Sequence, residues 1–395
     1  MTTLDQHADA RSRTAPSWHD ARAVAHAAAQ ARRPVAVPLD AACGRVLADD
    51  VLATTALPAF TSSAMDGWAV CGDGPWLRTG TVLAGARPPR ALRPGEAVVI
   101  ATGAQVPEGT CAVLRSEDGV ETEGLVVGRV LDGADLRPAG EEARAGDVLL
   151  DKGTRLRPAH LGLAAAAGHD TLRVLPSPSV DVLVLGDELL ASGSAGDGQV
   201  RDALGPQLPA WIRALGAEHR GTSRVVDDAG LLREALAASR GDVVVTTGGT
   251  AAGPVDHVHR CLADLGAELI VDSVAVRPGH PMLLASLPDG RNMVGLPGNP
   301  LAAVVGLLTL AAPLLDGLRG LAPQPLGSAR LADDVAGPRH GHRLIPCSLQ
   351  HGLASPCAAT GSAMLRGLAS ADGLAVVGPG RHPRRSVVAW LPLPA

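Results

Sequence analysis

The 395-residue sequence has one phenylalanine, no tyrosine and one lysine, Lys152, among 35 basic residues. Aromatic residues make up only 2% of the chain, so cores must be built from Leu, Val and Ala. This pattern is typical of a gene that has drifted toward GC-rich codons. A rare residue that persists against such drift is a candidate for a specific role. Phe60 is one such residue, and Asn299 is one of only two asparagines. Without a specific role, Phe60 would be an ordinary core aromatic and Asn299 a turn residue.

Several classes of protein are disfavoured by what is missing. The net charge of −5 gives no basic footprint for nucleic acid. The six cysteines include no CxxC pair, which leaves a structural zinc site or a disulfide framework unsupported. The first 16 residues lack the apolar segment of a secretory signal. The longest apolar run, 301–315, is short for a membrane span and contains Pro313, so we expect a buried helix. The expectation is a cytoplasmic protein in a reducing compartment.

The apolar content of 46% is ample for cores, and the length suggests two to four domains at about 150 residues each. Helical spacing is found over 17–33 and again over 154–168, and short apolar segments alternate with Gly/Pro turns over 71–142. From 180 to 325, apolar runs typical of buried parallel strands alternate with amphipathic segments, which predicts an open α/β sheet. Short strands return over 326–395.

We therefore expect an α/β multidomain protein. The predicted parts are a flexible tail (1–16), a helical dimerisation or linker domain (17–50 with 143–175), an inserted β-rich module (51–142), a central α/β domain (176–325) and a C-terminal β domain (326–395).

Three motifs lie where strands of the α/β domain are expected to end, which is the usual binding edge of such a sheet: GDEL at 186–189, TTGGTAAG at 246–253 and LPGNP at 296–300. The glycines of TTGGT allow backbone N–H groups to approach an anion, although strand–Gly-Gly turns are also common without any ligand. Four acidic residues occur at the same edge: Asp187, Glu188, Asp202 and Asp256. Clustered carboxylates beside phosphate-binding loops suit Mg²⁺. Helix capping is the alternative for Asp202 and Asp256. Arg277 and His280 flank a Pro-Gly turn and could bind an oxyanion.

These motifs resemble the molybdopterin molybdenumtransferase family, which includes the gephyrin E-domain type. The similarity covers residues 20–378 and rests on LPAFTSSAMDGWAV, ATGAQVPEGTCAV, RPAGEEARAGDVLL, GDEL, TTGGTAAGPVDHV, AVRPGHPMLL and GLPGNP, in that order. The resemblance implies an elongated homodimer in the cytoplasm that makes molybdenum cofactor. Adenylated molybdopterin and molybdate would be its substrates, Mg²⁺ its metal and AMP a product. The resemblance implies a molybdopterin-adenylating enzyme as a possible partner, and it implies no binding to nucleic acid or to a membrane.

The resemblance also implies roles for individual residues. The catalytic set is Asp66, Glu142, Glu188, Asp202 and Asp256, of which Asp66, Glu188, Asp202 and Asp256 would hold the metal. The substrate-binding set is Thr102, Thr247, Gly248, Gly249, Pro297, Gly298, Asn299 and Pro300. The molybdate-binding set is Arg277, His280, Arg343 and Ser362.

The chain departs from the family pattern at several of these motifs. Glu142 replaces an aspartate, Arg277 and His280 replace two lysines, and the positions that carry other polar residues in the family hold Ala203, Leu204, Pro254 and Ala302. Two alternatives to the enzyme therefore remain. One is a catalytically weakened paralogue that serves as a pterin-binding or scaffold protein. The other is a related nucleotide-hydrolysing enzyme built on the same α/β domain.

Overall fold

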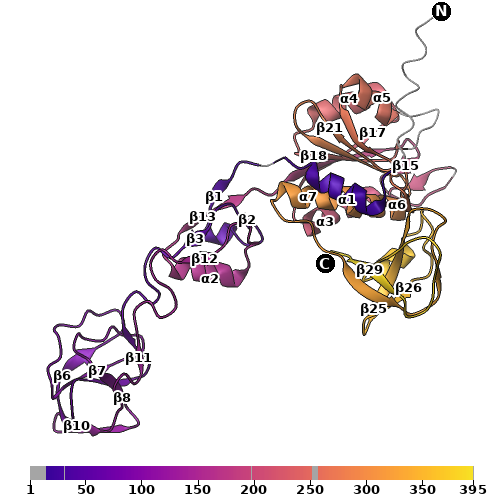
Figure 1. Ribbon diagram of the computed structural model, residues 1–395. Coiled ribbons are helices and arrows are strands. Elements are labelled where there is room, and N and C mark those ends of the chain that lie inside the picture. The colour runs from indigo at the N-terminus through magenta and orange to yellow at the C-terminus, as the bar shows by residue number, and fades with distance from the viewer. Residues whose placement is uncertain (1–14, 31, 197, 251–256, 395) are drawn as a thin grey trace, which may run out of the picture. The chain divides into compact units, whose positions relative to one another are not determined.

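The computed structural model describes residues 15–394 except 31, 197 and 251–256. The chain divides into two compact units (Figure 1). Unit 1 comprises the residues up to Arg33 together with Leu175–Ala395, and unit 2 comprises Pro34–Val174. We describe each unit by itself.

The centre of unit 1 is a six-stranded sheet of order β17-β14-β18-β22-β21-β19. The first four strands of this order run parallel, β21 is antiparallel to β22, and β19 is antiparallel to β21 and so runs in the same direction as the first four. Their bounds are β14 Ser179–Leu185, β17 Glu218–Val225, β18 Val243–Thr247, β19 Glu268–Asp272, β21 Leu283–Ser286 and β22 Asn292–Leu296. All five residues of β18 and of β22 are buried, as a parallel sheet covered on both faces requires.

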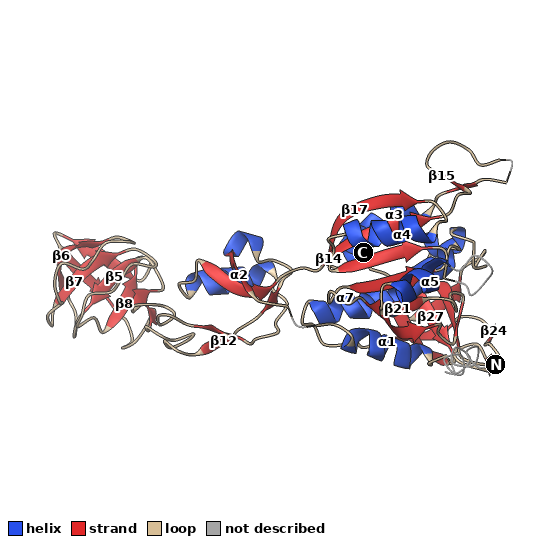
Figure 2. Cartoon of the chain, turned by 90° about the horizontal axis from the view of Figure 1, so that it is seen from above, coloured by secondary structure: helices blue, strands red, loops and turns tan. Residues whose placement is uncertain are grey.

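Helices cover both faces of this sheet (Figure 2). One face packs against α1 (Trp18–Ala27), α3 (Leu204–Ala214) and the continuous helical segment Pro300–Leu318, which is α6 (Pro300–Gly306), a π-helical turn (Leu307–Ala311) and α7 (Ala312–Leu318). The other face packs against α4 (Ala229–Ala238) and α5 (His257–Asp264). The segment Pro300–Leu318 is long and apolar enough to cross a membrane, yet 83% of it is buried inside the protein. It is a core helix, as predicted for 301–315.

The C-terminal part of unit 1 is a small β domain, also as predicted. Its main sheet has the order β20-β25-β26-β23-β29-β27, in which β20 (Val276–Arg277) comes from the α/β region. The remaining elements are β23 Gly327–Leu331, β24 Val335–Ala336, β25 His342–Gln350, β26 Leu353–Pro356, α8 Arg366–Ala369, β27 Gly373–Val377, β28 Arg381–His382 and β29 Val387–Pro392. A separate core around Trp390 and Cys347 holds it together.

Unit 2 contains a small α+β region and the inserted β-rich module. In the former, β1 (Val35–Pro38), β13 (Thr171–Leu175) and β2 (Val46–Leu47) form a sheet, β3 (Val51–Leu52) pairs with β12 (Val148–Leu150), and α2 spans Pro158–Ala166. The module carries a sheet of order β8-β5-β7-β6-β10-β9 and the pair β4–β11. Its strands are β4 Ser62–Ser63, β5 Gly67–Val70, β6 Trp76–Val82, β7 Glu96–Ile100, β8 Ala112–Arg115, β9 Gly119–Thr122, β10 Leu125–Gly128 and β11 Leu136–Arg137.

The N-terminal helix differs from the expectation in two ways. The helix predicted over 17–33 ends at Ala27, and it packs in the core of unit 1 rather than with the segment 143–175. Trp18, Ala21 and Ala25 are fully buried there, and the Trp18 indole N–H donates to Thr309 Oγ1 at 2.9 Å. The apolar face of this helix is thus covered within its own chain, so it gives no argument for a dimer.

Candidate active site

The three predicted loops of the α/β domain lie at one edge of the sheet. Strand β14 ends before GDEL, β18 runs into TTGGT and β22 into LPGNP, and these strands are parallel neighbours in the order β14-β18-β22. In register, Thr247 lies opposite Leu296, and the Gly248 N–H donates to the Leu296 carbonyl at 2.9 Å. A Cβ added to Gly298 would lie 3.7 Å from Gly248 Cα. The two glycine loops are therefore in direct contact.

Glycine is required at the tightest point of this contact. Gly248 and Gly249 both have positive φ, at 86° and 66°, which side chains rarely adopt. A Cβ on Gly249 would lie 2.9 Å from a methyl group of Val258. Beside them, Thr246 is fully buried and its hydroxyl has no hydrogen-bond partner in the described part of the chain.

Asp202 is held in place by three interactions. Its Oδ1 accepts from the backbone N–H groups of Leu204 and Gly205, both at 2.9 Å, and so caps the start of α3. Its Oδ2 accepts from the Arg224 guanidinium. The Asp202 side chain is only 2% exposed, whereas that of Arg224, on β17, is 41% exposed. The contact with a helix start that the sequence offered as an alternative for Asp202 is thus present.

Glu188 lies close to Asp202 along the backbone. The Val200 N–H donates to the Glu188 carbonyl at 2.9 Å and the Asp202 N–H to the Leu190 carbonyl at 3.1 Å, which aligns β15 (Leu189–Leu190) with β16 (Val200–Arg201). The Glu188 side chain is exposed. Asp187 instead accepts from the Asp227 N–H at 3.2 Å and so links two loops of the sheet edge.

The predicted metal site is incomplete in the described residues. Asp256 lies outside them, and Asp66 belongs to unit 2. Within the described ranges, no three His, Cys, Asp or Glu side chains come together closely enough to hold a metal ion. The Glu188 carboxylate is exposed to solvent. Asp202 Oδ2 can accept a further interaction besides that from Arg224, because a carboxylate has about four acceptor positions. These two residues fit Mg²⁺ as partial ligands.

The loop that contains Ser362, in the C-terminal domain, contacts the start of α6. The Ser362 carbonyl accepts from the N–H groups of Leu301 and Ala302, at 3.0 and 3.2 Å, and Ala303 donates to the Asn299 carbonyl at 2.8 Å. Pro300, at the first position of α6, has no N–H to donate. Ser362, predicted as a molybdate contact, therefore lies beside LPGNP, and its carbonyl occupies the helix N-terminus. The Asn299 side chain is exposed and does not cap α6.

Arg277 and Arg343 are brought together by pairing of β20 with β25. They are direct register partners in this parallel pair, which places both on one face. Arg277 is exposed, and Arg343 donates to the Ala336 carbonyl at 3.3 Å. Next to Arg343, burial and then the charge of His19 lower the pKa of His342.

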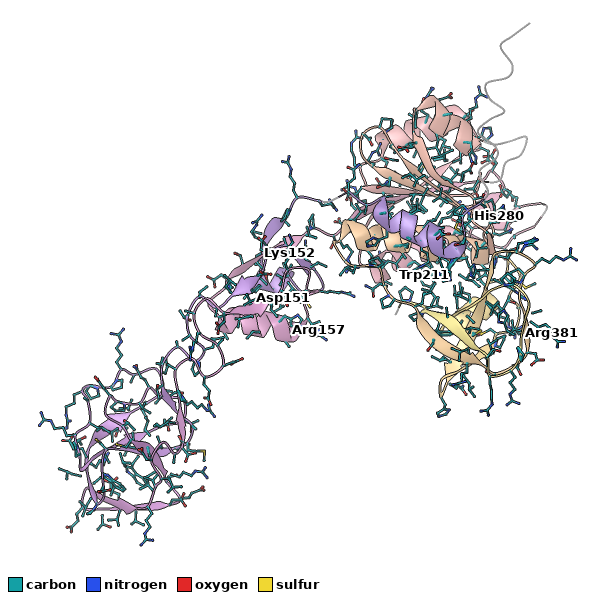
Figure 3. All side chains as sticks on the ribbon, viewed as in Figure 1. Asp151, Lys152, Arg157, Trp211, His280 and Arg381 are labelled. Carbon is teal, nitrogen blue, oxygen red and sulfur yellow. The ribbon has the colours of Figure 1, made fainter. Side chains whose placement is uncertain are left out.

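His280, labelled in Figure 3, is fixed by its own loop. Its Nδ1 lies 2.6 Å from the Val274 carbonyl, and its backbone carbonyl accepts from the Val274 N–H at 2.9 Å. Because a carbonyl only accepts, Nδ1 carries the proton, and in the neutral ring Nε2 presents a lone pair. The exposed side chain can donate from Nε2 only after it gains a second proton.

Unit 2 holds the other predicted residues. Asp66 is exposed, and its Oδ1 accepts from the Thr102 N–H at 2.7 Å, so these two predicted residues touch. Glu142 is exposed, and its N–H donates to the Leu57 carbonyl at 2.9 Å. Phe60 is 42% exposed and is therefore not a core aromatic.

Sequence reasoning missed Arg224 and the cap by the Ser362 carbonyl. Arg224 lies in β17, whose sequence EHRGTSRV has a single apolar side chain, Val225, and so gave no strand signal. A backbone carbonyl has no side-chain signature in any sequence.

Comparison with known proteins assigns every part of this architecture. Residues 16–168 match the model "MoeA N-terminal region (domain I and II)", 181–317 match "Probable molybdopterin binding domain" and 328–386 match "MoeA C-terminal region (domain IV)".

Individual relatives agree. Molybdopterin molybdenumtransferase 2 of Mycobacterium tuberculosis is 34% identical over 372 residues, which covers 87% of this chain and 91% of that protein. Molybdopterin molybdenumtransferase of Staphylococcus epidermidis is 30% identical over 306 residues, 72% of this chain and 71% of that protein. A crystal structure of a molybdopterin biosynthesis MoeA protein from Pyrococcus horikosii superimposes with a TM-score of 0.82 at 27% identity and covers 97% of this chain and all of that one. This chain belongs to the molybdopterin molybdenumtransferase family and is a transferase of molybdenum cofactor biosynthesis.

Proposed function

We propose that this enzyme inserts molybdate into an adenylated molybdopterin, with hydrolysis of the adenylate and release of AMP. The observation that carries the proposal is the contact between TTGGT and LPGNP at the edge where GDEL also lies. Flexible glycine loops beside exposed acidic residues suit a phosphate-linked ligand. In the reaction, water breaks the phosphate anhydride and AMP leaves. The two dithiolene sulfurs then replace one oxygen of molybdate, which departs as water with the two thiol protons.

Each group of residues has a distinct task in this proposal. Arg277 and Arg343, side by side on β20 and β25, supply two permanent cations for the molybdate oxygens. The backbone of Gly248 and Gly249 lets the pterin phosphate approach closely. Glu188 and Asp202 would hold Mg²⁺ together with Asp256 and Asp66, and the metal would neutralise phosphate charge.

Two further proposals concern assembly. Asp66, Thr102 and Glu142 lie in unit 2, so we propose a homodimer in which they complete the site of unit 1. Sedimentation at micromolar concentration should show a dimer; a monomer would remove this arrangement. A transient complex with the enzyme that adenylates molybdopterin would deliver the substrate directly.

The test is incubation with adenylated molybdopterin, molybdate and Mg²⁺, followed by measurement of AMP. Release of AMP that requires molybdate supports the proposal. The alternative, a pterin-binding scaffold without turnover, is favoured by the start of α3, where Ala203 and the buried Leu204 offer no polar side chain and Asp202 is engaged by Arg224. Tight pterin binding without AMP release would establish the scaffold.

A further inference from the structure

Two cysteines of the inserted module lie in contact on neighbouring strands. Cys71 directly follows β5, and Cys111 directly precedes β8, which is the antiparallel partner of β5. The Cys111 N–H donates to the Val70 carbonyl at 2.8 Å, and the Gly72 N–H donates to Cys111 Sγ at 3.4 Å. Val70 and Ala112 are register partners, so Cys71 and Cys111, one position further along, are neighbours across the two strands. The backbone pairing therefore holds the two cysteines side by side at this end of β5.

The two thiols differ in their access to solvent. Cys71 is 7% exposed within the small core that Ile100 and Val113 help to form. Cys111 is half-buried and lines a cavity of about 570 Å³ together with Gly72, Trp76 and Arg129. A small oxidant can thus reach Cys111 first, and the more deeply buried Cys71 is its neighbour across the strand pair.

We propose that Cys71 and Cys111 form a reversible disulfide when the protein meets hydrogen peroxide. The Cys111 thiolate attacks the peroxide, the O–O bond breaks, and a sulfenic acid forms on Cys111 as water leaves. The Cys71 thiolate then attacks the Cys111 sulfur, and the oxygen departs as a second water. The two thiols lose two electrons in total, and one peroxide is reduced to two waters. A dithiol reductant reverses the reaction by exchange.

The environment sets the speed of this chemistry. Burial, then the neighbouring Cys111 and Glu96, raise the pKa of Cys71. Since the thiolate is the nucleophile, the second step is slow near neutral pH and accelerates as the pH rises. A trappable sulfenic acid on Cys111 is expected in the interval between the two steps.

The position of the bond connects it to the candidate site. Strand β5 begins after Asp66 and ends before Cys71, so the disulfide fixes the end of the strand opposite to Asp66. It also links segments 40 residues apart in the sequence and therefore restricts the unfolded module. The oxidised protein should resist proteolysis within 71–111 better than the reduced protein. This inference does not depend on the proposed reaction.

The experiment treats the full chain with hydrogen peroxide and maps its peptides by mass spectrometry without reduction. The expected result is a peptide pair linked through Cys71 and Cys111, loss of two of the six thiols, and recovery of both with dithiothreitol. Cys71→Ser should give no linked pair but a sulfenic acid on Cys111 that dimedone traps. Cys111→Ser should leave Cys71 reduced.

Cys347→Ser is the matched control, since Cys347 is also buried but lies in the separate C-terminal core; it should form the Cys71–Cys111 bond like the wild type. Circular dichroism shows whether each variant folds. The proposal would be overturned by any of three results: six thiols that remain intact after peroxide treatment, a sulfenic acid on Cys111 that persists in the wild type at pH 8.5, or disulfide bonds that form only between chains.

Discussion

Asp66 Oδ1 accepts a hydrogen bond from the Thr102 backbone N–H at 2.7 Å, which joins the SAMDGWA and ATGA motifs across 36 positions of the sequence. The carboxylate is otherwise exposed. One side-chain oxygen positions the loop of Thr102, and the charge remains directed to solvent. The local fold and the proposed chemistry therefore depend on different properties of the same side chain.

Asp66→Asn should separate these two properties. The amide oxygen can still accept from Thr102, so the melting temperature should match the wild type, while loss of the charge should lower AMP release by roughly 10²–10³-fold. Asp66→Ala should lose the activity equally and cost about 0.5–1.5 kcal/mol of stability. Thermal unfolding and the AMP assay measure the two effects. An active Asp66→Asn variant would show that the charge of Asp66 has no catalytic role.

The neighbouring Gly67 should behave in the opposite way. A Cβ at this position would lie 2.0 Å from the Leu114 carbonyl oxygen, because β5 and β8 approach closely there. Gly67→Ala should cost at least about 1–3 kcal/mol, as overpacking usually does. Gly80→Ala in the same sheet is the control, since nothing lies within 4 Å of its added Cβ. Urea unfolding midpoints that coincide for the two variants would contradict the prediction that a side chain at position 67 clashes with the Leu114 carbonyl.

Much of unit 1 could be predicted because burial leaves a strong pattern in the sequence. The runs that form β14, β18 and β22 are apolar on both faces, and the glycine loops follow them directly. Strand β17 was not predicted because its first seven residues are exposed or half-buried and only Val225 is buried, so it has no apolar run.

For the N-terminal helix, the sequence predicted the element but not the core against which it packs. The helical spacing over 17–33 predicts a helix with one covered face, and in the structure that face is formed by Trp18, Ala21 and Ala25. Local periodicity does not say which core will cover the face, because that depends on partners far away in the sequence such as Thr309. The same limit applies to the candidate site: Arg224 and Asp202 are 22 positions apart and no motif connects them.

Arg224→Leu should destabilise unit 1 by about 1–3 kcal/mol. It would leave the Asp202 carboxylate, whose side chain is 2% exposed, without its cationic partner. Arg220→Leu in the same strand is the control, because Arg220 approaches Asp181 only to 4.0 Å and that carboxylate also accepts from Ser239 and Gly241. Exposed pairs of this kind contribute about 0–1 kcal/mol. The midpoint of chemical denaturation should be clearly lower for Arg224→Leu than for Arg220→Leu. Equal midpoints would mean that water replaces Arg224 as the partner of the Asp202 carboxylate.

Oxyanion affinity should depend on pH through His280. Its Nδ1–H is used by the Val274 carbonyl, 2.6 Å away, so the neutral ring has no donor left for an anion and presents the Nε2 lone pair instead. Protonation of Nε2 converts it into a charged donor. Hydrogen bonds to charged groups contribute about 1.5–3 kcal/mol. We therefore expect molybdate or tungstate to bind about ten-fold more tightly to the protonated ring than to the neutral ring, so that affinity rises as the pH falls.

His280→Lys should remove most of this pH dependence, because an ammonium stays charged across the neutral pH range, and Arg277 and Arg343 stay charged as well. His280→Gln provides a neutral donor at every pH and should bind throughout with one intermediate affinity. Calorimetric titration of the three proteins at each pH cancels the acid–base chemistry of molybdate itself, since all three meet the same anion species. Parallel pH profiles for wild type and His280→Lys would place His280 outside the anion site and leave Arg277 and Arg343 as its cationic donors.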